Sequence, residues 1–247
     1  MLSNSSRAAL GPQRRCASPS PRTRCVDGNA AEQAAYALSD CSFVFPITPS
    51  TAMAHASEEW SAAGRTNVWG RRVLVRQMQS EAGVAGALHG ALRAGALAST
   101  FTSSQGLLLM VPNLYKIAGE SLPLVVHLAA RALSAQTVTI FPDHSDVYAV
   151  RQTGVAVLSS HSVQDVADLS VVARASTAAV NSGTPFVHFF EGMQLSHEMA
   201  SVELPGPDEL SALAPTAAAE EFRRRAALSP ARPTATGVVV GRDTFWQ

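Results

Sequence analysis

Cysteine is scarce in this chain, which has three in 247 residues: Cys16, Cys25 and Cys41. None of them forms a C-x-x-C pair, and an odd count at this spacing supports neither a disulfide framework nor a zinc or iron–sulfur site. Any iron–sulfur or other metal centre in the reaction that this protein serves is therefore expected on another domain.

Long apolar runs are also missing. A membrane-spanning helix needs roughly eighteen or more consecutive apolar residues, and no stretch of the sequence approaches that length. We therefore expect no membrane span. The apolar content of 47% is typical of a globular chain, and the length fits one domain with an appendage.

Acidic residues are absent from residues 1–26, which carry five arginines. The whole chain has nineteen basic and nineteen acidic residues, so the part after residue 26 has fourteen basic and nineteen acidic residues. A mildly acidic body without a basic face argues against a nucleic acid as the main partner.

The first 26 residues are rich in Arg and Ser and lack the apolar core of a secretory signal. That composition is typical of an organellar transit peptide, and it does not separate a mitochondrion from a plastid. The alternatives to a transit peptide are an ordinary disordered leader and a mistranslated upstream stretch. In either of these two cases, a cytoplasmic location is expected.

From residue 27 onward, short apolar strands alternate with helical segments. Strands are predicted at 41–45, 72–76, 96–101, 122–130, 155–158 and 185–190, and a helix at 106–118 that kinks or restarts at Pro112. This alternation predicts an α/β domain over residues 27–200, with a parallel sheet of about six strands and helices on both faces. Residues 201–247 are rich in Ala, Pro and Arg, and we predict a linker or strap toward further domains, with one short helix at 220–227.

Four polar features follow predicted strands: Thr48, Glu81, the turn at 102–105 and Arg131. Ligands of parallel α/β sheets bind where the strands end. Taken alone, each residue also fits a plain structural role: a turn hydroxyl for Thr48, a solvated helix-start acid for Glu81, and a surface ion pair for Arg131.

The helix that Glu81 begins carries four glycines, each of which costs about 1 kcal/mol relative to alanine inside a helix. Such a helix indicates that another helix, a partner domain or a cofactor approaches its backbone closely. The glycines are Gly83, Gly86, Gly90 and Gly95.

Several longer motifs carry a resemblance. They are GNAAEQAAYALS, FPITPS, MQSEAGVAGALHGALRAGAL, TFTSSQGLLLMVPNLYKIAGE, AARAL, DHSDVYAVRQTG, SVQDVADL and HFFEG. In order and spacing they are similar to the N-terminal domain of the pyruvate:ferredoxin (flavodoxin) oxidoreductases, a family that includes pyruvate:NADP oxidoreductases. The resemblance covers roughly residues 27–198.

This resemblance implies a thiamine-diphosphate-binding fold of the pyrimidine-binding type. It implies that Glu81 is catalytic and binds the cofactor through the aminopyrimidine N1′, with which an acid can share a proton. It also implies that Thr48 and Arg131 hold pyruvate, because the planar guanidinium of arginine can bind a carboxylate through two hydrogen bonds. No metal ligand is expected on this chain.

The family's diphosphate and Mg²⁺ motif and its iron–sulfur cysteines are absent here. The resemblance therefore implies that Mg²⁺ and [4Fe–4S] clusters lie on missing domains, with thiamine diphosphate shared between them and this chain. Coenzyme A and ferredoxin or flavodoxin would be partners of the complete enzyme, which is expected to be a homodimer. The chain alone would then be a fragment, or a subunit that is inactive without its partners.

Some positions depart from the family pattern. A family acid is replaced by Gln77, Met193–Leu195 replace a segment with a basic residue, and residues 236–240 differ, although residues 243–247 match. These changes leave open two alternatives: a non-catalytic interaction or assembly subunit, or the same module of an oxidoreductase for another 2-oxoacid. We expect structural or surface roles for six histidines and a core role for Phe189 and Phe190. The histidines are His89, His127, His144, His161, His188 and His197.

Overall fold

The structure is a computed structural model that describes residues 23–26, 30–179, 183–231 and 233. The predicted differences at residues 236–240, the predicted match at residues 243–247 and nearly all of the predicted leader lie outside the described residues. The last four leader residues form strand β1 (Thr23–Val26), which pairs in antiparallel fashion with β8 (Ala200–Glu203).

The main sheet has six strands, all parallel, in the order β3-β2-β4-β5-β7-β6. This confirms the predicted α/β fold class. The strands are β2 (Cys41–Val44), β3 (Leu74–Gln77), β4 (Ala98–Thr102), β5 (Leu124–Ala130), β6 (Ala156–Ser160) and β7 (Phe186–Glu191). Every residue of the adjacent strands β4 and β5 is buried, as expected for strands covered on both faces.

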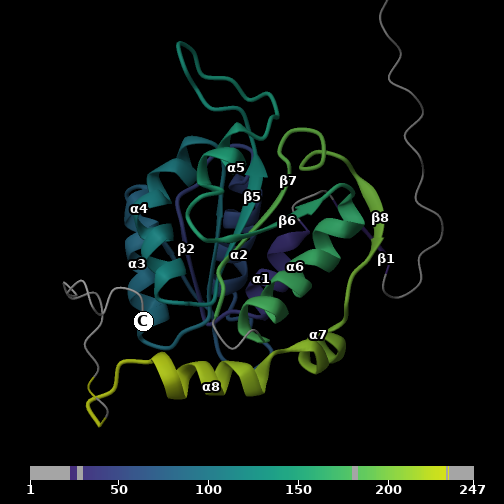
Figure 1. The fold of residues 1–247 in the computed structure, drawn as a ribbon. Helices are drawn as coiled ribbons and strands as arrows, with labels where there is room; N and C mark the ends of the chain where they lie inside the picture. Colours follow the sequence, from purple (N-terminus) through teal and green to yellow (C-terminus); the bar gives the residue numbers. More distant parts are fainter. Residues whose placement is uncertain (1–22, 27–29, 180–182, 232, 234–247) are drawn as a thin grey trace, which may run out of the picture.

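Helices cover both faces of this sheet (Figure 1). One core lies under α3 (Glu81–Arg93), α4 (Gln105–Gly119) and α5 (Ser145–Val150). The other lies under α1 (Ala31–Ala37), α2 (Thr51–Ala62) and α6 (Val163–Ala179). Helix α4 runs without a break through Pro112, so the predicted restart does not occur.

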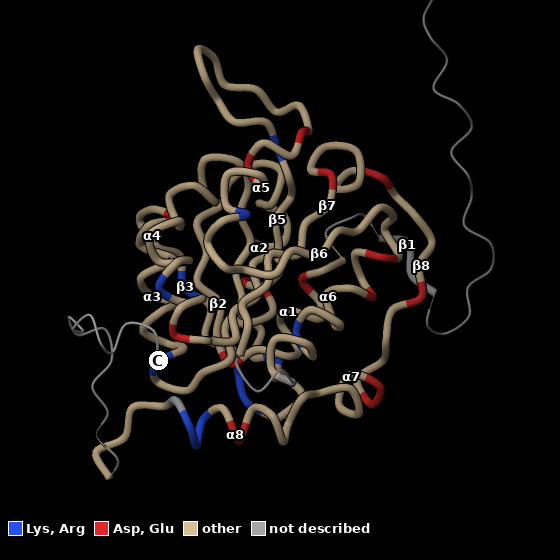
Figure 2. The backbone as a smooth tube through the Cα atoms, viewed as in Figure 1, with Lys and Arg blue, Asp and Glu red and all other residues tan. Residues whose placement is uncertain are grey.

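The predicted linker after residue 200 is more structured than expected. Besides β8 it forms two helices, α7 (Pro207–Leu213) and α8 (Thr216–Ala226), where one short helix was predicted. Leu210, Ala219 and Phe222 are buried against the domain. Acidic residues begin α7 and arginines end α8, which suits both helix dipoles (Figure 2). The described tail is therefore a part of this domain.

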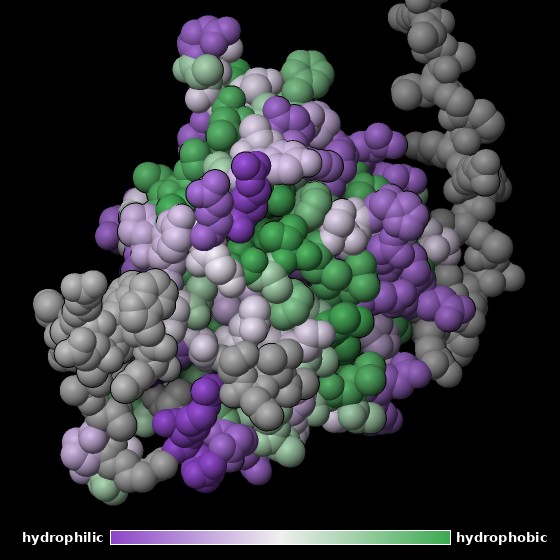
Figure 3. Space-filling model, viewed as in Figure 1, coloured by the Kyte–Doolittle hydropathy of each residue, from purple (hydrophilic) through white to green (hydrophobic). Residues whose placement is uncertain are grey.

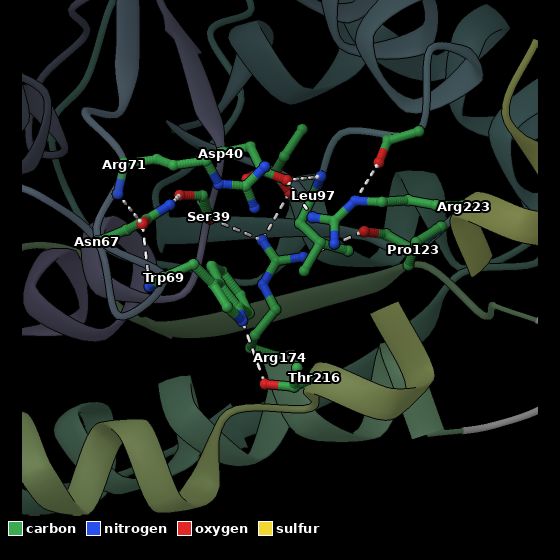
Figure 4. A network of polar contacts seen from close by, with 12 residues as sticks. Ser39, Asp40, Asn67, Trp69, Arg71, Leu97, Pro123, Arg174, Thr216 and Arg223 are labelled. Carbon is green, nitrogen blue, oxygen red and sulfur yellow. Dashed lines mark hydrogen bonds and ion pairs between the residues drawn. The ribbon is translucent and has the colours of Figure 1, made fainter. Parts of the chain in front are cut away.

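A polar network joins the amino ends of the strands to this tail (Figure 4). Arg174 of α6 is buried and donates to the carbonyl oxygens of Ala98 (2.6 Å) and Pro123 (3.1 Å). Asp40 accepts from the backbone N–H of Leu97 (2.9 Å) and forms an ion pair with Arg223 of α8 (2.7 Å). These structural contacts occupy the amino ends of the strands. The candidate site lies at the opposite, carboxyl ends.

Candidate active site at the carboxyl ends of the strands

The four polar features predicted from the sequence all lie at the carboxyl edge of the sheet. Thr48 follows β2, Glu81 follows β3 as the first residue of α3, the turn at 102–105 follows β4, and Arg131 follows β5. Residues far apart in the sequence are thereby collected by the parallel strand order.

Glu81 is a buried acid, with 5% of its surface exposed. Ser80 caps its helix, because the Ser80 side chain accepts the backbone N–H of Gly83 (3.2 Å). The start of α4 packs directly against it: a Cβ added to Gly106 would lie 2.7 Å from Glu81 Oε1 and would collide with the hydroxyl of Thr102. Only glycine fits between these two oxygen atoms.

The hydroxyl of Thr102 is itself an unusual feature. Its Oγ1 is buried and has no hydrogen-bond partner among the described residues, although it lies beside the same Gly106 as the Glu81 carboxylate. Buried polar atoms in native proteins are nearly always paired, so an unpaired hydroxyl here marks a place where a polar ligand can bind.

Arg131 is also buried, at 6% exposure. Its Nη1 donates to the backbone carbonyl of Thr48 (2.6 Å), whereas its Nε is buried and has no partner in the described part of the chain. Burial lowers the pKa of Arg131, and the Asp146 and Glu81 carboxylates act in the opposite direction. The guanidinium therefore has a donor without a partner among the described residues, and the charges of both acids act on it.

The structure brings Thr48 and Arg131 together, but through the Thr48 backbone and not its hydroxyl. Thr48 itself is exposed, at a cis peptide bond before Pro49. The backbone carbonyl of Ile47 accepts from the N–H and hydroxyl of Ser50 (both 2.8 Å), which closes this turn.

The turn after β4 is tied to the end of β5. The Ser103 hydroxyl donates to the Ala129 carbonyl (2.7 Å), and the Gln105 side chain donates to the Ser134 carbonyl (3.0 Å). Ser104 has a φ of 50°, a backbone conformation that is rare outside glycine. The backbone N–H of Ser104 donates a hydrogen bond to the Asp146 carboxylate (2.9 Å).

Asp146 was not predicted from the sequence as a site residue. It is fully buried, and burial raises its pKa while hydrogen bonds from the backbone N–H groups of Arg131, Ser104 and Val147 oppose the rise. The one available signal was its place in the DHSDVY motif, just inside a helix start.

Two of the six histidines and both phenylalanines are buried within the domain. His127 and His188 are buried on neighbouring strands with Nδ1 atoms 3.0 Å apart, and His188 contacts the Ser160 hydroxyl at 2.8 Å. Phe189 and Phe190 are buried in the two cores.

Two kinds of feature are not found within the described ranges. No group of three or more His, Cys, Asp or Glu side chains there is arranged to hold a metal ion. Nor is any described helix long and apolar enough to cross a membrane.

A groove of about 820 Å³ lies away from the strand ends, between α6, β8 and α7. Apolar residues gather over α6 and beside α7 on this face (Figure 3). None of the site residues described above lines it.

Comparison with known proteins identifies the family. Residues 33–247 match the family model described as "Pyruvate flavodoxin/ferredoxin oxidoreductase, thiamine diP-bdg", that is, thiamine diphosphate-binding. The chain belongs to this family.

Three oxidoreductases from different organisms are similar in sequence to this chain. It is 51% identical over 223 residues to the pyruvate:ferredoxin oxidoreductase of Moorella thermoacetica, covering 90% of this chain and 19% of that protein. It is 50% identical to the mitochondrial pyruvate dehydrogenase [NADP(+)] of Euglena gracilis, in a match that covers 90% of this chain and 12% of that protein. It is 49% identical to the pyruvate-flavodoxin oxidoreductase of Klebsiella pneumoniae, in a match that covers 92% of this chain and 19% of that protein. The chain thus spans a fifth or less of the length of these three relatives.

A solved structure supports the fold. The 2-oxoglutarate:ferredoxin oxidoreductase from Magnetococcus marinus, with 2-oxoglutarate, coenzyme A and succinyl-CoA bound, superposes with a TM-score of 0.63 at 21% identity, covering 78% of this chain and 34% of that one. The chain therefore has the thiamine-diphosphate-binding α/β fold of this enzyme class.

Proposed function

We propose that this chain is the pyrimidine- and pyruvate-binding module of a thiamine-diphosphate-dependent pyruvate:ferredoxin (flavodoxin) oxidoreductase. The complete enzyme decarboxylates pyruvate oxidatively, yields acetyl-CoA and passes the electrons to iron–sulfur centres on other domains. The observation that carries the proposal is that the buried Glu81 carboxylate and the buried Arg131 guanidinium lie at the same edge of the sheet, where the Glu81 charge raises the pKa of Arg131.

The residues present fit thiamine diphosphate. Glu81 offers a carboxylate and Thr102 an unpaired buried hydroxyl on either side of Gly106, which suits a polar heteroaromatic ring. When bound, the cofactor supplies the carbon nucleophile that attacks the oxo group. Glu81 holds the ring nitrogen N1′ and exchanges a proton with it.

Arg131 binds the 2-oxoacid carboxylate in this proposal. Its unpaired Nε and its buried, positively charged guanidinium are what a carboxylate needs, since a planar guanidinium can donate two parallel hydrogen bonds. Thr48 orients the oxo group from the neighbouring loop. The Arg131 bond to its carbonyl fixes that loop relative to the cation.

Mg²⁺, [4Fe–4S] clusters, coenzyme A and ferredoxin or flavodoxin belong to the complete enzyme in this proposal, which we expect to be a homodimer. An organellar location is proposed from the Arg-rich first residues and is supported by the mitochondrial Euglena relative.

The test uses a complete enzyme that carries this chain as its pyruvate-binding domain, with Arg131→Ala and Arg131→Lys. Loss of a buried hydrogen bond between charged groups should cost about 2–4 kcal/mol. That corresponds to a rise of roughly thirty- to a thousandfold in KM for pyruvate, or an equal loss in kcat/KM. Lysine should recover only part of the loss, because an ammonium group cannot donate in two parallel directions.

The exposed Arg151 provides a matched control, since Arg151→Ala should leave pyruvate kinetics unchanged. Thiamine diphosphate affinity is measured separately by calorimetry. If that affinity falls in Arg131→Ala while pyruvate dependence stays normal, then Arg131 serves the cofactor and the assignment is wrong.

A further inference from the structure

Asp146 lies between the two halves of the proposed site. It belongs to the first turn of α5, is fully buried and points its carboxylate at the ends of β4 and β5. Its Oδ2 accepts the backbone N–H of Ser104 (2.9 Å) and of Arg131 (3.0 Å), and its Oδ1 accepts the N–H of Val147 (2.8 Å). A single oxygen atom thus fixes two strand ends relative to each other.

The bond to Ser104 controls the half of the site that contains Glu81. Ser104 precedes α4 with a φ of 50°, which is unfavourable for a residue other than glycine. The N–H bond to Asp146, together with the bond from the Ser104 hydroxyl to the Ala132 carbonyl (2.7 Å), supports that conformation directly before α4 begins. Two residues later, Gly106 packs between Glu81 and Thr102.

The bond to Arg131 controls the other half. It fixes the backbone from which the guanidinium extends, while the negative charge of Asp146 favours the buried cation. Two other charged groups of the described residues act on this pair: Asp143 raises the pKa of Asp146, and Glu81 raises the pKa of Arg131.

We propose that Asp146 is a positioning residue that sets the separation between the 2-oxoacid-binding Arg131 and the cofactor-binding pocket at Glu81 and Thr102. This inference rests on the proposed function of the site. It assigns Asp146 no contact with substrate or cofactor.

Asp146→Asn is the sharpest substitution, because it keeps the size of the side chain and removes one acceptor. Whichever way the amide is turned, an NH₂ group then faces at least one of the three backbone N–H donors. Asp208→Asn is the matched control. Asp208 is exposed and lies in the first turn of α7, as Asp146 lies in the first turn of α5, but it is remote from the carboxyl ends of the strands.

Two readouts are measured for each variant. In this chain, the backbone amide shifts of Ser104 and Arg131 are recorded by ¹⁵N–¹H NMR. In the complete enzyme, KM and kcat for pyruvate are measured beside thermal stability. We expect Asp146→Asn to shift both amides and to raise KM for pyruvate at least tenfold, whereas Asp208→Asn should behave as the unsubstituted protein in both readouts.

A fall in thermal midpoint without a change in KM would make Asp146 merely structural and would overturn the inference. An unsubstituted enzyme without pyruvate turnover would overturn the proposed function, and this inference with it. An enzyme that turns over pyruvate but whose KM is unaffected by Asp146→Asn overturns this inference alone.

A second measurement keeps the proposal testable if Asp146→Asn does not fold. In the unsubstituted chain, the Asp146 carboxyl carbon and the Ser104 and Arg131 amides are followed against pH. All three signals should change with one midpoint, because both amides donate to the titrating carboxylate. Separate midpoints would overturn the proposal.

Discussion

At the scale of single residues, the proposed chemistry depends on two buried side chains of opposite charge, Glu81 and Arg131. Neither is paired as an ordinary ion pair would be: the described contacts of Arg131 are with the Thr48 carbonyl and, through its backbone, with Asp146. Burying charged groups is costly unless they are paired or hydrogen-bonded, so their retention here favours a ligand-binding role over a purely structural one.

Glu81→Gln should abolish turnover in the complete enzyme and leave the fold intact. Glutamine keeps the size of the side chain and its hydrogen-bonding ability but cannot supply a proton. Loss of such a group typically reduces rates by about 10²–10⁴-fold. The measurement is exchange of the C2 proton of bound thiamine diphosphate, followed by NMR. Glu59→Gln, at an exposed position of α2, serves as the control, and an unchanged exchange rate in Glu81→Gln would refute the assignment.

At the scale of elements, the contact between α3 and α4 shapes the pocket. Close approach was predicted for four glycines, of which Gly95 lies just beyond the end of α3. A Cβ at Gly83 would meet the Gln79 side chain and one at Gly95 would meet Ala227, but a Cβ at Gly86 or Gly90 would meet no atom within 4 Å among the described residues. The close approach occurs at Gly106 of α4, where a Cβ would meet the Glu81 carboxylate and the Thr102 hydroxyl.

Gly106→Ala should therefore lower the free energy of unfolding, by about 1–3 kcal/mol, because the added methyl overpacks a tight contact. It should also weaken thiamine diphosphate binding in the complete enzyme. Gly86→Ala is the matched control, since an exposed helical glycine replaced by alanine should raise stability by up to about 1 kcal/mol. Chemical denaturation of the chain measures both. A Gly106→Ala variant as stable as Gly86→Ala would contradict this account of the pocket.

At the scale of the whole molecule, the sheet centre carries a buried polar cluster of His127, His188 and Ser160. Burial lowers the pKa of His188 to about 4 and, together with the neighbouring His188 and Arg174, lowers the pKa of His127 well below 6.5. The folded protein therefore holds both rings neutral across mildly acidic pH.

Stability should consequently fall as the pH falls. The unfolded chain takes up protons on these rings below about pH 6.5, whereas folded His188 does so only near pH 4. The stabilising contribution is thus full above about pH 6.5 and is lost progressively toward pH 4, by ~3 kcal/mol for His188.

Chemical denaturation between pH 7.5 and pH 4.5 tests this. His188→Gln should flatten the pH dependence, and His161→Gln, at an exposed position, should not. An identical slope in His188→Gln and the unsubstituted chain would exclude the buried pair as its source.

The sequence by itself determined the fold class and the edge at which the site lies. Both depend on local patterns: short apolar runs form buried strands, and polar residues just beyond them must meet where parallel strands end. The family motifs likewise directed attention to Thr48, Glu81 and Arg131 before any contact was known.

Tertiary structure alone decided how those residues are held. Asp146 binds donors 42 and 15 positions away in the sequence, and Arg131 reaches the carbonyl of a residue 83 positions away. The composition of the tail, rich in Ala, Pro and Arg, predicts a linker or strap. In the structure, α8 packs on the domain through the buried side chains of Ala219 and Phe222. Arg223 of the same helix donates a hydrogen bond to the Asp40 carboxylate. Such contacts follow from the packing of distant segments, and no local pattern of residues encodes them.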